Sequence, residues 1–221
     1  MTHESSPTPP AQSQQHPWAM VHAERMALAQ DLAGLSDPQW NAASLCTEFT
    51  VREVVAHLTS GASLGPLRWM AGVIRHRFDF DAQNAYRLAQ QLGADHDETL
   101  ERFRRSIAST TKPPVPVVAV LGEVIVHGED IRHPLGIRRE YPIATLTRVA
   151  EYYHRSNMTV PSKRRAQGLH LSATDGPFSG GAQDGAPVSG GTLALIMAMA
   201  GRSAHGAQLA GEGAGAFAEA R

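Results

Sequence analysis

The sequence predicts a mainly helical protein that ends in a small α/β appendage. Two observations indicate this class. Apolar residues recur at helical spacing through most of residues 18–157, which predicts a helical body there. The chain then changes character, because Gly168–Ala173 alternates like a strand and 176–191 is crowded with glycine, serine and proline. We therefore expect a small α/β region over 158–221.

The N-terminal part begins with a tail and continues into a helix. Residues 1–17 are dominated by threonine, serine, proline and glutamine, a composition that predicts a disordered tail. The first amphipathic helix is expected over 18–34, with Glu24 and Arg25 outside its apolar stripe. The stripe itself consists of four residues: Val21, Leu28, Leu32 and Leu35.

The sharpest helix start lies at Thr50. Thr50 and Glu53 have the Ser/Thr-x-x-Glu spacing of a capping box, immediately before the apolar run Val54–Leu58. This places His57 on the second long helix, and we expect it to face inward. The remaining helices are predicted over 66–77, 81–92, 95–109, 143–157 and 192–200, and the Gly/Ala-rich end of the chain is expected to be weakly structured or to form a small edge.

Composition limits the function classes. The chain has 221 residues, of which 42% are hydrophobic, enough for one core with a small appendage. Its 20 basic and 21 acidic side chains leave a formal charge of −1, which argues against nucleic acid or an anionic membrane as the main partner. The N-terminus lacks a signal-peptide pattern, and no apolar run reaches the roughly 20 residues that a membrane helix needs.

A few single residues have simple expected roles. Cys46 is the only cysteine, so no internal disulfide can form; this fits a reducing cytoplasm, and we expect Cys46 to be a small buried packing residue. Trp40 and Trp69 are expected in the core. His76 lies between arginines and is expected on a solvated turn, and His133 is expected at a helix end.

The most informative stretch is Gly122–Arg132, in which Glu123 and His127 are four residues apart within or beside an apolar run. Core packing requires no carboxylate there, because an unpaired buried carboxylate costs on the order of several kcal/mol. If the segment is a helix, both side chains lie on one face, one turn apart. The valine-rich run 115–127 is also compatible with a strand, in which these residues again share a face.

His57 is the third member of a candidate metal site. With Glu123 and His127 it completes a two-histidine, one-glutamate set, and catalytic zinc commonly takes three protein ligands and an open fourth position. The alternative is a buried histidine bonded to a backbone carbonyl. Asp130 either orients His127 from behind or pairs with Arg132.

Four segments, in this order, carry a resemblance to a known family: Leu32–Trp40, Ser44–Cys46, Thr50–Leu58 and Gly122–Arg132. They resemble the actinobacterial maleylpyruvate isomerase family of mycothiol-dependent enzymes, over about 18–205. The resemblance implies a DinB-like four-helix bundle and a helix over 117–133. It also implies a divalent metal, expected to be Zn²⁺, held by three residues: His57, Glu123 and His127.

The resemblance further implies chemistry. Mycothiol would be the thiol cofactor or co-substrate, and a small electrophile would be isomerised or S-conjugated. Arg87 and Arg202 resemble arginines that hold an acidic substrate or stabilise an enolate. The simpler alternatives are a helix-surface charge for Arg87 and a helix C-terminal charge for Arg202. Glu48-Phe49, where relatives often have Gly-Trp, and the shorter, glycine-rich C-terminal part leave the substrate open.

Other functions remain open from the sequence. A fourth protein ligand, Asp130 or Cys46, would close the site and favour a non-catalytic metal-binding protein. A metal-assisted hydrolase would need a general base, for which Glu53 is the nearby candidate, although the capping box already explains it. We expect a cytoplasmic monomer or homodimer without nucleic-acid or membrane partners.

Overall fold

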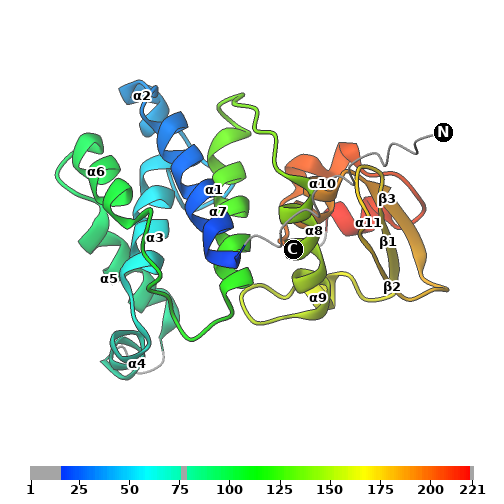
Figure 1. Ribbon diagram of the computed structural model, residues 1–221. Helices are drawn as coiled ribbons and strands as arrows, with labels where there is room; N and C mark the ends of the chain where they lie inside the picture. Colours follow the sequence, from blue (N-terminus) through cyan, green and yellow to red (C-terminus); the bar gives the residue numbers. More distant parts are fainter. Residues whose placement is uncertain (1–15, 76–78, 220–221) are drawn as a thin grey trace, which may run out of the picture.

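The computed structural model describes residues 16–75 and 79–219 (Figure 1). Helices form one end of the molecule and a small sheet lies at the other end (Figure 1). The predicted class, mainly helical with a small C-terminal α/β part, is confirmed. Within the described ranges, none of the helices has the length and apolar character needed to cross a membrane. The predicted tail lies outside the described residues, apart from its last two positions.

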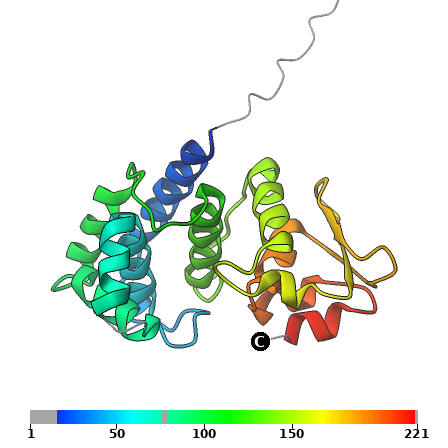
Figure 2. The same ribbon diagram turned by 90° about the horizontal axis from the view of Figure 1, so that it is seen from below.

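Four helices form the bundle: α1 (Pro17–Leu32), α3 (Val51–Ser63), α6 (His96–Ser106) and α7 (Val117–Arg132). Helix α1 packs against α7 and α6, and α3 packs against the same two helices. Their apolar side chains, such as Val21, Val55 and Ile125, are fully buried in one shared core. Both views place α7 between the other bundle helices and the C-terminal part (Figure 2).

Three further helices lie around the bundle: α2 (Asp37–Trp40), α4 (Pro66–Arg75) and α5 (Phe80–Gln91). Helix α5 packs on α3. Trp40 is buried, as predicted. The predictions for the Trp69 side chain and for His76 fall outside the described residues.

The two site-bearing helices begin for clear local reasons. At α3, Thr50 Oγ1 accepts a hydrogen bond from the Glu53 N–H (3.3 Å), and Glu53 accepts one from the Thr50 N–H (2.8 Å), so the capping box is confirmed. Helix α7 starts after Pro116, and its 16 residues resolve the choice between helix and strand in favour of helix. A Cβ at Gly122 would lie 2.8 Å from Tyr153 on α8 (Ile143–Arg155), so glycine lets α8 approach beside Glu123.

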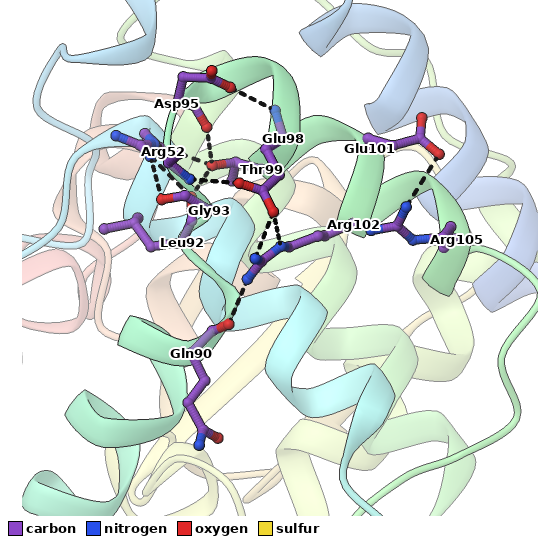
Figure 3. Close-up of polar contacts among 11 residues, drawn as sticks. Arg52, Gln90, Leu92, Gly93, Asp95, Glu98, Thr99, Glu101, Arg102 and Arg105 are labelled. Carbon is purple, nitrogen blue, oxygen red and sulfur yellow. Dashed lines mark hydrogen bonds and ion pairs between the residues drawn. The ribbon is translucent and has the colours of Figure 1, made fainter.

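Arg52 ties α3 to the connection between α5 and α6 (Figure 3). Its Nη2 donates to the carbonyl oxygens of Leu92 (3.0 Å) and Gly93 (2.9 Å), and its Nε donates to Thr99 Oγ1 (3.1 Å). Gly93 has a positive φ of 73°, which favours glycine at this turn. These bonds fix the start of α6 against the helix that carries His57.

In the C-terminal part, one apolar helix lies between a three-stranded sheet and α8. Strand β1 (Leu169–Ala173) is central in the order β2-β1-β3, antiparallel to β2 (Ser179–Gly181) and parallel to β3 (Ala186–Gly190). The apolar helix α10 (Thr192–Met199) contacts both the sheet and α8 (Ile143–Arg155). The short helices here are α9 (Ser162–Arg165), a 3-10 turn (Ser203–Gln208) and α11 (Ala214–Glu219).

The end of the chain is more ordered than expected. The Gly/Ala-rich stretch, which the sequence predicts to be weakly structured or a small edge, pairs with β3 through Ala210 and Ser189, and beyond that point Ala214 and Phe217 are buried on α11. One aromatic side chain therefore gives this stretch an apolar face that packs against the 3-10 turn.

The prediction that Glu24 and Arg25 lie outside is wrong, because only 3% and 2% of their surfaces are exposed. Helix α1 contacts α7 and α6, so its buried sector is wider than its apolar stripe. Glu24 is paired with Arg139, at 3.1 Å. Arg25 Nη1 donates to the carbonyl oxygens at the end of α6.

Candidate metal centre

The fold brings His57 of α3 next to Glu123 and His127 of α7. Their ligand atoms all lie within 4.8 Å of one another. His57 Nε2 is 3.8 Å from Glu123 Oε2, and the two imidazole rings meet edge to face with centroids 5.0 Å apart. Two imidazoles and a carboxylate suit a divalent transition metal. Within residues 16–75 and 79–219, no fourth histidine, cysteine, aspartate or glutamate joins this group.

The charge state of Glu123 suits a metal ligand. Burial favours the neutral acid, but the contact with His57 and the electrostatic effects of His127 and Arg202 outweigh it and lower the pKa of Glu123. The side chain is therefore a carboxylate at neutral pH. It remains 39% exposed and His57 is 25% exposed, so the group is open on one side.

Asp130 supports His127 from behind. Its Oδ2 is 2.9 Å from His127 Nδ1, and Arg202 donates to both carboxylate oxygens, at 2.9 and 2.8 Å. Burial raises the pKa of Asp130, but the bonds from His127 and Arg202 outweigh it and lower the pKa. An ionised Asp130 accepts the Nδ1 proton, which leaves Nε2 of His127 as the free ligand atom.

The alternative pairing of Asp130 with Arg132 is not found. Arg132 donates instead to Asp31 (2.7 Å) and to the hydroxyl of Tyr141 (2.8 Å). The Asp130 side chain is fully buried, and its carboxylate forms ion pairs with His127 and Arg202. Of the two partners that the sequence suggested for Asp130, the structure shows contact with His127.

Arg87 lines a cavity beside His57, Glu123 and His127, the three candidate metal ligands that we call the metal group. The cavity has a volume of about 220 Å³, and His57, Glu123 and Arg87 all line it. Arg87 Nη2 donates to the carbonyl oxygen of Arg68 (3.2 Å), whereas its buried Nε has no hydrogen-bond partner. The remaining wall is largely apolar: Leu58, Leu64, Pro113, Val115, Val120 and Val124.

Arg202 occupies a different position from Arg87. It follows α10 and lines a separate cavity of about 800 Å³ together with Cys46. Its hydrogen bonds connect it to His127 through Asp130, and its charge helps to lower the pKa of Glu123. It also donates to the Ala200 carbonyl (3.1 Å), so the helix-end interpretation applies as well. Cys46 is half-buried, and burial raises the pKa of its thiol. It is not part of the metal group.

Two other predictions concern residues near the site. His133 caps the end of α7, as expected, and its exposed ring lies 4.6 Å from that of His205. Glu53 accepts bonds from the Thr50 N–H and from its hydroxyl, both at 2.8 Å, so its carboxylate is used in the capping box. This removes the support for Glu53 as the general base of a hydrolase.

Sequence reasoning missed Arg25, which lines the same cavity as Arg87. A signal was present, because Arg25 follows Val21 by four residues and precedes Leu28 by three. It therefore lies on the apolar stripe of α1, where a charged residue needs a reason.

These features define a class of protein: a DinB-like helical bundle with two histidines and a glutamate gathered beside a cavity. The family model described as the mycothiol maleylpyruvate isomerase N-terminal domain matches residues 21–132, and the chain belongs to this family.

Two solved structures share the fold. The first is described as the crystal structure of the mycothiol-dependent maleylpyruvate isomerase; it is 14% identical, with a TM-score of 0.60, and the match covers 89% of this chain and 91% of that one. The second is a histidine-to-alanine mutant of that isomerase, 13% identical with a TM-score of 0.57 and the same coverage. Among curated proteins, none matches this chain.

Proposed function

We propose that this chain is a metal-dependent enzyme that uses mycothiol to isomerise or S-conjugate a small electrophile. The observation that carries the proposal is the group of His57, Glu123 and His127 beside a cavity that Arg87 also lines. Family membership supports mycothiol as the thiol. Zn²⁺ is the ion we propose first, although two imidazoles and a carboxylate accept several divalent metals.

The proposed ligands have complementary tasks. His57 and His127 would bind as neutral imidazoles, Glu123 would bind as a carboxylate, and Asp130 would hold the His127 ring in place. Three protein ligands leave a position for an exogenous thiol. A divalent metal held there would lower the pKa of a bound thiol and so supply a thiolate at neutral pH without a protein cysteine.

Residues that line the cavity would stabilise the electrophile as it reacts. In an isomerisation, a C–S bond forms at a conjugated double bond, the resulting single bond rotates, and the C–S bond then breaks. In an S-transfer the C–S bond stays and the neighbouring carbon takes a proton. Arg87 would stabilise the negative charge that develops in either case, because its unpartnered Nε is a free donor in a partly apolar cavity.

Metal analysis followed by thiol-consumption assays tests the proposal. We expect wild type to retain a divalent metal and His57→Ala to lose it, since two ligands bind far more weakly than three. With mycothiol, wild type should consume or recycle thiol against maleylpyruvate or a generic electrophile.

Two results would contradict this function. Metal-free wild type from cells grown with adequate zinc would remove the metal site. Full metal occupancy without turnover of any electrophile would instead favour a non-catalytic metal-binding protein.

A further inference from the structure

A cavity at the C-terminal end of α8 is separate from the metal group and has a basic wall. Its volume is about 660 Å³, and it is lined by four basic side chains: His154, Arg155, Lys163 and Arg164. Among the described residues, no aspartate or glutamate lines it. The sequence has the same bias, because residues 152–174 contain no acidic residue although the whole chain has 21. A cavity of this size commonly accommodates a small molecule, and its charge favours an anion.

Hydrogen bonds hold α9, which carries two of these cations, against the end of α8. The buried hydroxyl of Ser162 donates to the carbonyl oxygen of Ser156 (2.8 Å). The Lys163 N–H donates to the same carbonyl oxygen (3.1 Å). The Arg164 N–H donates to Asn157 Oδ1 (3.0 Å). The backbone that carries the cations is therefore fixed beside the cavity before any ligand binds.

The three fixed cations in this wall have no counter-ion from the protein. In the part of the chain that the structure describes, the side chains of Arg155, Lys163 and Arg164 form no ion pair and donate no hydrogen bond. Burial lowers the pKa of His154, and the charges of Arg155 and Lys163 lower it further. Like charges disfavour the protonated imidazole, so the cavity has an uncompensated positive potential that an anion would relieve.

We propose that this cavity binds a small molecule with two phosphate groups, one contacted by Arg155 of α8 and the other by Lys163 and Arg164 of α9. Charge favours two groups, since one phosphate monoester carries about −1.5 to −2 at pH 7 and two match three fixed cations more closely than one does. The guanidinium fork suits phosphate oxygens, and the lysine adds a point charge. This site does not depend on the proposed function.

A solvated basic surface that attracts any anion weakly is the competing explanation. Arg104 provides a matched control for Arg164, because both arginines are exposed but Arg104 does not line the cavity. It belongs to α6, which Figure 1 shows on the far side of the bundle from α9. A general effect of charge predicts that Arg164→Gln and Arg104→Gln act alike. A specific site predicts that only Arg164→Gln weakens binding.

Calorimetric titration at low ionic strength tests the site, because salt screens exposed charges. The probes are fructose bisphosphate with a phosphate on each terminal carbon, fructose with one terminal phosphate, and fructose. We expect wild type to bind the bisphosphate saturably, the monophosphate more weakly, and fructose not measurably. Arg155→Gln and Arg164→Gln should each weaken bisphosphate binding about 5- to 10-fold, because charge-assisted hydrogen bonds are lost. Arg104→Gln should bind as wild type does.

Several results would overturn the site. These are no saturable bisphosphate binding by wild type, equal losses in Arg164→Gln and Arg104→Gln, and fructose that binds as tightly as its bisphosphate. Tighter binding of the monophosphate would overturn the assignment of two phosphates. A poly-aspartate peptide that binds more tightly than the bisphosphate would make an acidic protein segment the ligand. If Arg164→Gln does not fold, Arg155→Gln decides by the same comparison with Arg104→Gln.

His57→Ala separates this site from the metal group, since phosphate oxygens also bind metal ions. We expect His57→Ala to bind the bisphosphate as tightly as wild type, with or without bound metal. An affinity loss in His57→Ala as large as that in Arg164→Gln would place the phosphates at the metal group and contradict this site. A protein that turns over no thiol but binds the bisphosphate through Arg164 would fail the proposed function and keep the site.

Discussion

At the scale of single residues, Asp130 determines how His127 can be used. The carboxylate contacts His127 Nδ1 on one side and the guanidinium of Arg202 on the other, and none of its side-chain surface is exposed. This arrangement fixes both the ring orientation and the tautomer of a proposed ligand. The hydrogen bonds from His127 and Arg202 also keep Asp130 ionised despite its burial.

Removing the Asp130 charge should weaken metal binding. Asp130→Asn keeps the shape but accepts the Nδ1 proton less strongly, so we expect the Zn²⁺ affinity to fall about 10- to 100-fold. Competition with a chromophoric chelator measures this affinity. Asp175→Asn, which replaces the carboxylate that accepts from Thr192 in the C-terminal part by a weaker amide acceptor, is the control and should bind as wild type does. Equal affinities of Asp130→Asn and wild type would contradict the orienting role.

Asp130 should also make the free energy of unfolding depend on pH in the acid range. The pKa of Asp130 is lower in the folded protein than its ordinary value of 3.8, so its contribution is fully present above that value. It is then lost as the pH falls through the lower folded pKa. Metal-free wild type should therefore exceed Asp130→Asn in stability at neutral pH, with the difference shrinking in acid. Urea unfolding at several pH values measures it, and a difference that grows toward low pH would have the wrong sign.

At the scale of elements, α7 needs its glycine beside Glu123. Tyr153 on α8 occupies the space that a Cβ at Gly122 would take. The close approach brings α8 against the face of α7 next to the metal group. Glycine is otherwise unfavourable in a helix interior, so its presence here has a packing reason.

Gly122→Ala should therefore destabilise the protein despite the better helix propensity of alanine. Overpacking costs about 1–3 kcal/mol, more than the gain of up to ~1 kcal/mol in propensity. Thermal unfolding should show a lower midpoint. Gly61→Ala is the control, because nothing lies within 4 Å of a Cβ there and the substitution should be neutral or stabilising. If both variants were stabilised, the packing argument would fail.

Some features of the helices could be predicted from the sequence and others could not. The start of α3 was predictable because the capping box is a local hydrogen-bond pattern. The valine-rich α7 was ambiguous from its residues, since propensity does not separate a buried helix from a buried strand. The burial of Arg25 was missed although its spacing places it on the apolar stripe of α1, because a charged side chain is ordinarily expected to face solvent.

At the scale of the whole molecule, the ion pair between Arg202 and Asp130 connects the C-terminal part to the bundle. Arg202 follows α10 in the C-terminal part, and Asp130 lies on bundle helix α7.

The sequence indicated the three proposed ligands, since His57 follows a capping box and Glu123 precedes His127 by one turn. It left Asp130 between two roles, because the choice depends on the long-range approach of Arg202. Residues 18–157 and 158–221 remain our proposed division, and α8 contacts both α7 and α10.

We propose that His57, Glu123 and His127 hold a metal with a position open to a thiol. Titration of mycothiol into the cobalt(II)-substituted protein tests it most directly, because sulfur bound to cobalt gives a charge-transfer absorption that nitrogen and oxygen ligands lack. We predict that this band appears in wild type, saturates with mycothiol, and is absent in His57→Ala. Cobalt-loaded wild type that develops no such band at saturating mycothiol would contradict the account.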